Sequence, residues 1–290
     1  MVICPSRSIR IGPHIELTVA QIHLAAFYGR PGITAELISK GAKADDVEKP
    51  GMETPLAMAA FEGNITVMEL LLTAKADVNA ESAADTAQGL VLNSAIYSGN
   101  KKAVELLVNK GAIIHSDKYS PLAYAVALPD REIYDYLLKA GQVHLQPYDY
   151  GMALKAAAEY GNTEVFTELL EHEHEKQYIQ DALSSAAEEE EWDIVRLILD
   201  KHNDLECDKL IVSVAKATEP QAEILDFVWD KAKGSISREA LNKALFEAAD
   251  NEKELIVQKL LDFGADANAT DPDSEYVYPT NYAHVTDRTY

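Results

Sequence analysis

The chain has 290 residues, of which 47% are hydrophobic and 26% are charged, and its formal net charge is -22. The acidity is concentrated in residues 146–290, which hold 13 Lys and Arg against 32 Asp and Glu. Such a charge disfavours binding to nucleic acid or to an anionic membrane, because both use Lys and Arg to neutralise phosphate. It is compatible with solubility alone and, equally, with recruitment of a basic partner.

The cysteine content and the N-terminal sequence indicate in which cellular compartment the protein is expected. Cys4 and Cys207 are far apart and lack ligand spacing, so neither a disulfide framework nor a zinc site is predicted. Pro5, Arg7, Arg10 and Pro13 interrupt the N-terminus before an apolar stretch of signal-peptide length, and nowhere do about 18 apolar residues run together. We therefore expect a soluble intracellular protein, cytoplasmic or nuclear.

Along the chain, the clearest pattern is a pair of short helices within residues 54–80, which recurs in weaker copies before and after it. Leu56 and Ala60 lie four residues apart and predict a short helix with a small buried side. Gly63 ends this helix. A second helix follows, with its apolar stripe at Val67, Leu70 and Leu71. One unit is therefore predicted to be a helical hairpin followed by a loop, and the longest loops are residues 43–53 and 79–89.

Taking Gly63 as the reference, the same turn recurs at intervals that imply eight units. The equivalent positions are Gly29, Gly63, Gly99, Pro129, Gly161, Glu190, Pro220 and Glu252. Pairs of alanine stand at one offset before five of these turns, at residues 25–26, 59–60, 157–158, 186–187 and 248–249. Twelve residues after four turns, a glycine is expected to adopt a left-handed conformation that closes the second helix, at Gly41, Gly111, Gly141 and Gly264.

These motifs resemble the ankyrin-repeat family, whose pattern is close to TPLHxAAxxGH, then VVxLLL, then GADVNA. Thr54–Ala80 reads TPLAMAAFEGNITVMELLLTAKADVNA, and residues 20–42, 120–141 and 248–269 support the match. The resemblance implies an all-α solenoid of stacked helix-turn-helix units with short β-turn or loop fingers. The expected repeats are 18–50, 51–86, 87–117, 118–148, 149–178, 179–207, 208–238 and 239–270, in a single domain with capping segments at 1–17 and 271–290.

In this family, the two positions before the turn generally face the concave groove. In this chain, aromatic residues predominate at these positions in the N-terminal repeats, and carboxylates predominate in the C-terminal repeats. The predicted partner-binding residues are Phe27, Tyr28, Phe61, Glu62, Tyr97, Glu159, Tyr160, Glu188 and Glu189. Aromatic side chains bury large areas with few rotors, which makes them interface anchors. The alternative is that these aromatics cap helix ends and pack against neighbouring repeats.

Two functions follow from this pattern. The first is a non-catalytic, monomeric interaction module or adaptor that binds a protein or peptide partner along its concave groove, and a basic or amphipathic peptide would suit the order of aromatic and acidic residues. The second is an enzyme or small-molecule binder on a divergent scaffold, with a pocket lined by Tyr, His and Glu. No GxSxG, P-loop or GxGxxG motif occurs, so no catalytic residue, metal ligand or cofactor is predicted. The chain could also be the receptor or sensor portion of a longer polypeptide.

Overall fold

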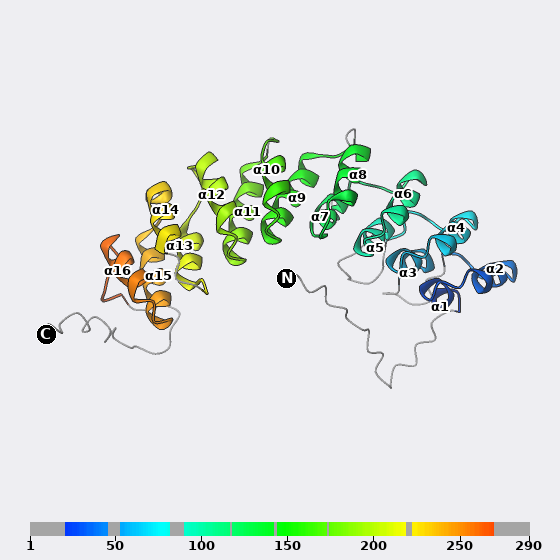
Figure 1. Ribbon diagram of the computed structural model, residues 1–290, viewed down its shortest axis with the longest axis horizontal. Helices are drawn as coiled ribbons and strands as arrows, with labels where there is room; N and C mark the ends of the chain where they lie inside the picture. Colours follow the sequence, from blue (N-terminus) through cyan, green and yellow to red (C-terminus); the bar gives the residue numbers. More distant parts are fainter. Residues whose placement is uncertain are drawn as a thin grey trace. The chain divides into compact units, whose positions relative to one another are not determined.

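The structure is a computed structural model that describes residues 21–45, 53–81, 90–116, 118–141, 144–172, 174–218 and 222–269 (Figure 1). Within these residues the chain is all-α, as predicted, with 16 helices and one isolated β-bridge between Glu81 and Leu90. The predicted capping segments at 1–17 and 271–290 lie outside the described residues, and so do most residues of the loops 43–53 and 79–89. None of the described helices is long and apolar enough to cross a membrane.

The chain divides into two compact units, residues 1–113 and 114–290. The first unit contains α1 (Gln21–Phe27), α2 (Pro31–Ser39), α3 (Pro55–Phe61), α4 (Ile65–Thr73), α5 (Val91–Tyr97) and α6 (Lys101–Asn109). The second contains α7 (Pro121–Val126), α8 (Glu132–Gly141), α9 (Pro147–Glu159), α10 (Thr163–Leu169), α11 (Lys176–Glu188), α12 (Trp192–Lys201), α13 (Asp208–Lys216), α14 (Ala222–Ala232), α15 (Arg238–Asp250) and α16 (Glu254–Asp262). The predicted repeat boundaries and the single continuous domain stay predictions.

Within each unit, consecutive helices form hairpins, and the hairpins stack. The odd-numbered helices contact one another and form what we call the first row, while the even-numbered helices form the second row. Small side chains let the first row pack closely: Ala26, Ala59, Ala60 and Ala95 are completely or almost completely buried in the first unit. The alanine pairs of the sequence therefore mark the contact between neighbouring hairpins.

Local sequence explains where several first-row helices begin. Thr54 caps α3 by accepting a hydrogen bond from the backbone N–H of Ala57 at 3.1 Å, and Pro55 occupies the first helical position. Ser120 and Pro121 repeat this arrangement at α7, and the Ser237 hydroxyl caps α15 by accepting from Ala240 at 3.1 Å. A hydroxyl before the helix thus satisfies a backbone donor that has no partner inside the helix.

Most of the turn positions inside the hairpins have a left-handed backbone. Gly29, Gly63, Gly99 and Gly161 have φ between 59° and 67°. Glu190 and Glu252 hold the same conformation, with φ of 61° and 55°, although side chains disfavour it. The left-handed turn is therefore kept at these two positions without glycine, whereas Pro129, at the fourth turn, does not have positive φ. Pro220 lies outside the described residues.

The residue after the turn ties neighbouring hairpins together. Asn64 donates its side-chain amide to the carbonyl oxygens of Ala26 and Phe27 at 2.9 and 3.0 Å. Asn100 donates its side-chain amide to the carbonyl oxygen of the turn residue Gly63 at 3.3 Å. In the second unit, the Lys253 ammonium takes this role and donates to the carbonyl oxygens of Ala215, at 2.8 Å, and Ala217. We call these side chains inter-repeat tethers.

The Asn100 tether makes Gly63 more sensitive to substitution than Gly99. A Cβ at Gly63 would lie 2.8 Å from the Asn100 amide nitrogen, whereas one at Gly99 meets nothing within 4 Å, and their φ values are 66° and 67°. Gly99→Ala is expected to lower the free energy of unfolding by about 1–2 kcal/mol through backbone strain, and Gly63→Ala by about 1 kcal/mol more. Urea unfolding followed by circular dichroism measures both losses. Equal losses in the free energy of unfolding would show that the Asn100 tether does not make Gly63 more sensitive.

One of the predicted helix-closing glycines behaves differently from the other three. Gly41, Gly111 and Gly264 have φ between 90° and 101°, as expected. The prediction of a left-handed cap at Gly141 is wrong, because this residue is the last residue of α8 and does not have positive φ. It is buried, and a Cβ there would lie 2.9 Å from Leu145 and 3.2 Å from Ile114. Close packing, rather than backbone conformation, therefore explains a glycine here.

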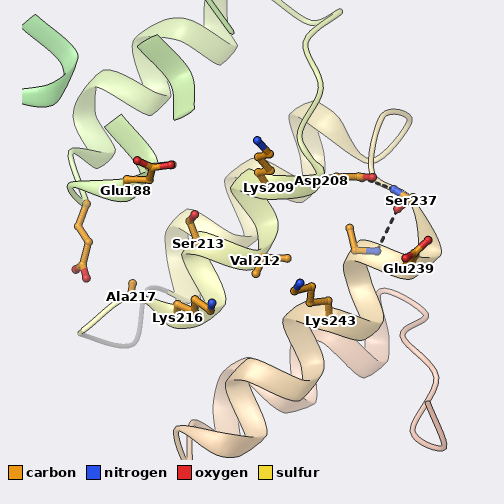
Figure 2. A pocket seen from close by; sticks show the side chains of 13 residues that line it. Glu188, Asp208, Lys209, Val212, Ser213, Lys216, Ala217, Ser237, Glu239 and Lys243 are labelled. Atoms are coloured by element: carbon orange, nitrogen blue, oxygen red, sulfur yellow. Dashed lines mark hydrogen bonds between the residues drawn. The ribbon is translucent and has the colours of Figure 1, made fainter. Parts of the chain in front are cut away.

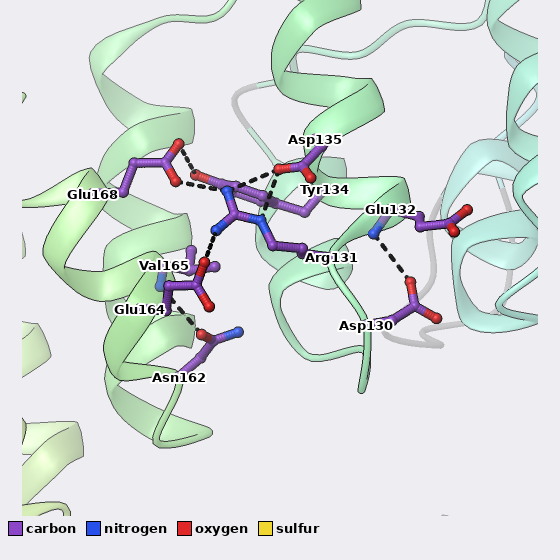
Figure 3. Close-up of polar contacts among 9 residues, drawn as sticks. All are labelled: Asp130, Arg131, Glu132, Tyr134, Asp135, Asn162, Glu164, Val165 and Glu168. Carbon is purple, nitrogen blue, oxygen red and sulfur yellow. Dashed lines mark hydrogen bonds and ion pairs between the residues drawn. The ribbon is translucent and has the colours of Figure 1, made fainter.

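A network around Arg131 links α8 to α10 in the second row (Figure 3). The Arg131 guanidinium donates to Asp135 at 2.9 Å, Glu164 at 2.5 Å and Glu168 at 2.7 Å. It also lies 5.6 Å from the centre of the Tyr134 ring, and the Tyr134 hydroxyl is 3.5 Å from the Glu168 carboxylate. One cation thus holds together three carboxylates from two hairpins.

Candidate functional site

The predicted partner-binding residues of the first unit lie at the ends of α1, α3 and α5. Tyr28 and Tyr97 expose 60% and 53% of their surface. Phe27 and Phe61 are half-buried, and Glu62 is exposed. Because these aromatic side chains offer a large exposed area at the helix ends, we treat them as one surface, which we call the aromatic patch and define as Phe27, Tyr28, Phe61 and Tyr97.

The rings of the aromatic patch contact one another in pairs. Phe27 and Tyr28 meet edge to face with their centroids 5.2 Å apart. Phe61 and Tyr97, from neighbouring hairpins, stack at 5.1 Å with an angle of 14° between their planes. The stack of Phe61 on Tyr97 is thus packing between repeats, which was the alternative interpretation of these residues, whereas Phe27 and Tyr28 contact each other within one repeat. The remaining exposed surface of Tyr28 and Tyr97 is available for contact.

In the second unit, three predicted residues come together where α9 and α11 end. Tyr160 is 56% exposed and lies close to Glu159 and Glu189, both of which are exposed. Partial burial is the larger cause that raises the pKa of the Tyr160 phenol, and these two carboxylates are the smaller one. The group combines an aromatic ring with two negative charges.

A tyrosine that the sequence analysis missed lies beside this group. Burial raises the pKa of the Tyr124 phenol, and the neighbouring phenols of Tyr119, Tyr160 and Tyr148 raise it further. Tyr124 lies three residues further from the turn than the predicted positions, on the half-buried side of α7. The search considered the two residues immediately before each turn, so it could not find an aromatic one helical turn earlier.

The ninth predicted residue, Glu188, lies at the edge of a hollow on the first row of the second unit (Figure 2). This hollow has a volume of about 690 Å³ and crosses α13, with residues of α11 and α15 on either side. Its charged lining includes three lysines, at positions 209, 216 and 243, besides the carboxylates. The expected acidic surface is therefore interrupted by cations here, and we call this site the lysine hollow.

Sequence patterns could have indicated part of the lysine hollow. Lys209, Val212, Ser213 and Lys216 follow the spacing of one helix face, while the buried residues of α13 occupy the opposite face. The signal was missed because the sequence analysis considered only the two residues before each turn, and these four residues lie further from Pro220. Lys243 could not be added from sequence, since it lies on α15 and joins the others through packing alone.

The described residues show no arrangement typical of a metal centre, because no three or more His, Cys, Asp or Glu side chains are grouped to hold an ion. The residues that line the lysine hollow include neither Tyr nor His. The hollow thus differs from the Tyr-, His- and Glu-lined pocket that the enzyme hypothesis predicts. Its lysines and partly exposed apolar and hydroxyl groups are suited to binding a polar ligand by charge and shape.

Comparison with known proteins finds similarity to repeat proteins. Residues 53–83 match the family Ankyrin repeat. The chain is 37% identical over 91 residues, 31% of its length, to "Ankyrin repeat and KH domain-containing protein mask" of Drosophila melanogaster. It is 28% identical over 187 residues, 61% of its length, to "Ankyrin repeat and KH domain-containing protein mask-1" of Caenorhabditis elegans. It is 29% identical over 170 residues, 57% of its length, to "Ankyrin repeat domain-containing protein SAT10" of Stachybotrys chartarum.

These relatives are much longer than the chain. The matched segments cover 2% of the Drosophila protein, 7% of the Caenorhabditis protein and 8% of the Stachybotrys protein. The similarity thus concerns a repeat region within each of them.

Proposed function

Because the chain belongs to the ankyrin-repeat family, we propose that it is a non-catalytic interaction module that binds a protein or peptide along its first-row helices. Stacked repeats present long open surfaces, and such surfaces suit extended partners better than small molecules. The aromatic patch carries this proposal. Its two tyrosines combine large exposed area with a hydroxyl donor, which is the composition of interface anchors.

Carboxylates of the second unit favour a partner that carries a basic group. Glu159 and Glu189 flank the exposed ring of Tyr160, so a Lys or Arg side chain could pair with the carboxylates and stack on the ring. Exposed ion pairs of this kind contribute about 0.2–1 kcal/mol each, and they affect specificity more than affinity. The aromatic patch is therefore expected to supply most of the binding free energy.

The double substitution Tyr28→Ser and Tyr97→Ser tests the proposal. Partners captured from a native lysate by the unaltered chain are identified by mass spectrometry, and the tightest is purified for titration calorimetry. We expect the variant to bind this partner at least tenfold more weakly, because each exposed anchor contributes about 1 kcal/mol or more. Both side chains are more than half exposed, so the fold should be retained.

Ile33→Ser is the matched control. Ile33 lies on α2 in the second row and is 55% exposed, so its replacement removes an exposed apolar side chain of the same unit outside the aromatic patch. The control should bind with unchanged affinity. If the tyrosine variant also binds normally, the aromatic patch is not the binding surface; if both variants lose affinity equally, the second row participates and the proposal must be revised.

A further inference from the structure

Three histidines lie where two hairpins of the second unit meet. His172 and His174 follow α10, in the segment that leads to α11, and His202 follows α12. The ring of His172 stacks on Tyr150 of α9, with the ring centroids 4.5 Å apart and an angle of 22° between the planes. Because α9 packs on α11 and α10 packs on α12, this place belongs to the contact between two hairpins. We call these three side chains, His172, His174 and His202, the histidine joint.

The hydrogen bond of His174 identifies which ring nitrogen carries the proton. Its Nε2 atom lies 2.7 Å from the carbonyl oxygen of Leu169. A carbonyl can only accept, so Nε2 carries the hydrogen and Nδ1 is the bare nitrogen of the neutral ring. Nδ1 is shielded from solvent and has no hydrogen-bond partner among the residues that the structure describes. A second proton would therefore create a buried donor without an acceptor, which costs free energy.

The surroundings of His174 also disfavour a positive charge on its ring. Burial is the main cause that lowers the pKa of this imidazole. The hydrogen bond to Leu169 acts in the opposite direction, and the imidazoles of His172 and His202 lower the pKa further. Glu175, the next residue, is exposed, so solvent screens its charge. The neutral ring is thus the form that fits the folded chain.

Charged groups on the elements around the histidine joint are paired with one another. Glu171 forms an ion pair with Lys201 of α12 at 2.5 Å, and Lys176 of α11 forms one with Asp204 at 2.8 Å. The hydrogen bond from Lys176 lowers the pKa of the Asp204 carboxyl most, and nearby His202 lowers it as well. Asp204 therefore offers a negative charge to His202 when that ring is protonated.

The direction of the pH effect follows from the two states of His174. In the unfolded chain, a histidine protonates at about pH 6.5. Because the pKa of His174 is lower in the folded chain, the unfolded state binds more protons below about pH 6.5, and stability falls with the pH. The fall ends only when the folded ring is protonated too. At higher pH the ring is neutral in both states, and His174 makes no pH-dependent contribution.

We propose that the histidine joint is a pH-sensitive contact between the α9–α10 hairpin and the α11–α12 hairpin. In acid, the protonated ring of His174 leaves Leu169, and the two hairpins separate locally at this end. The new N–H then donates to water. Since α9 and α11 lead to Tyr160 and Glu189, acidification is also expected to alter the group that these two residues form with Glu159. The histidine joint does not depend on what the first row binds, so it can fail without changing the proposed function.

Titration of the histidine rings by NMR, with the full chain, tests the protonation step. The chain has 8 histidines, and triple-resonance spectra of the unaltered chain assign their ring signals. We expect His174 to titrate below the ordinary value of about 6.5. A titration midpoint at or above this value would overturn the proposal, and this result needs no variant.

Urea unfolding at about pH 8 and at about pH 5.5 measures the effect on stability. His174→Gln keeps a donor for the Leu169 carbonyl and cannot be charged. We expect the urea midpoint of this variant to fall less between the two pH values than that of the unaltered chain. His144→Gln is the matched control, because it removes an exposed histidine of the same unit, and its midpoint should fall as much as that of the unaltered chain.

Amide hydrogen exchange, expressed as protection relative to an unfolded peptide at the same pH, locates the change. We expect the segment between α10 and α11 to lose protection at the lower pH in the unaltered chain and to keep it in His174→Gln. Equal falls in the urea midpoint for these two proteins, or an equal loss of protection in both, would show that His174 is not the group that senses pH.

Discussion

Replacing Tyr134 with Ala is expected to lower the free energy of unfolding by about 3–5 kcal/mol, the largest effect among the substitutions considered. Tyr134 is one of the largest fully buried side chains. It lies on α8, and its hydroxyl reaches Glu168 of α10. Its removal leaves a cavity that the short helices around it cannot fill without losing their own packing. Urea unfolding followed by far-UV circular dichroism measures the loss.

Tyr134→Phe is the matched control for this prediction. It keeps the ring and removes only the hydroxyl, whose distance of 3.5 Å to Glu168 indicates a weak hydrogen bond (Figure 3). We expect a loss below about 1 kcal/mol. A loss as large as that of the Ala variant would show that the polar network, rather than ring packing, is the main contribution of this residue.

Asp149→Ala is expected to lower the free energy of unfolding by about 2–4 kcal/mol, because it removes two contacts of a buried carboxylate. Asp149 lies in the first turn of α9 and is fully buried. Its Oδ2 atom accepts a hydrogen bond from the backbone N–H of Gln146 at 2.9 Å and lies 2.7 Å from Nδ1 of His115. The same oxygen thus caps a helix and connects it to the segment before α7.

Two further variants separate these roles. Asp149→Asn retains one acceptor oxygen and should show an intermediate loss. His115→Ala, alone and combined with Asp149→Ala, completes a double-mutant cycle in which we expect a coupling energy of about 0.5–3 kcal/mol. Strictly additive losses would mean that the contact between His115 and Asp149 contributes nothing to stability and that capping alone explains the effect of Asp149.

The hairpins and their turns could be predicted from sequence because they depend on local chemistry. Gly63 and the alanines before it specify a turn and a close contact within one short segment, and Thr54 specifies the start of α3. Glu190 and Glu252 were placed by the spacing alone, although neither favours the left-handed backbone that it adopts. The spacing of the repeats therefore located turns that the conformational preference of glutamate would not have indicated.

The parts that could not be predicted depend on contacts between hairpins. Arg131 reads as an ordinary exposed charge in the sequence, but its three carboxylate partners include two on the next hairpin. Gly141 has the spacing of a helix cap, whereas its actual constraint comes from Leu145 and Ile114. The lysine hollow likewise depends on packing between hairpins, because Glu188 and Lys243 reach it from α11 and α15 rather than from α13.

The inter-repeat tethers bear on how such a chain can change length during evolution. Asn64 and Asn100 occupy the same position after their turns, but Asn64 binds the carbonyls of Ala26 and Phe27, whereas Asn100 binds that of Gly63. Lys253 binds the carbonyls of Ala215 and Ala217 from this position with a longer, charged side chain. The donor position is thus kept while its acceptors differ, so we expect hairpins to be exchanged most readily between junctions that carry asparagine.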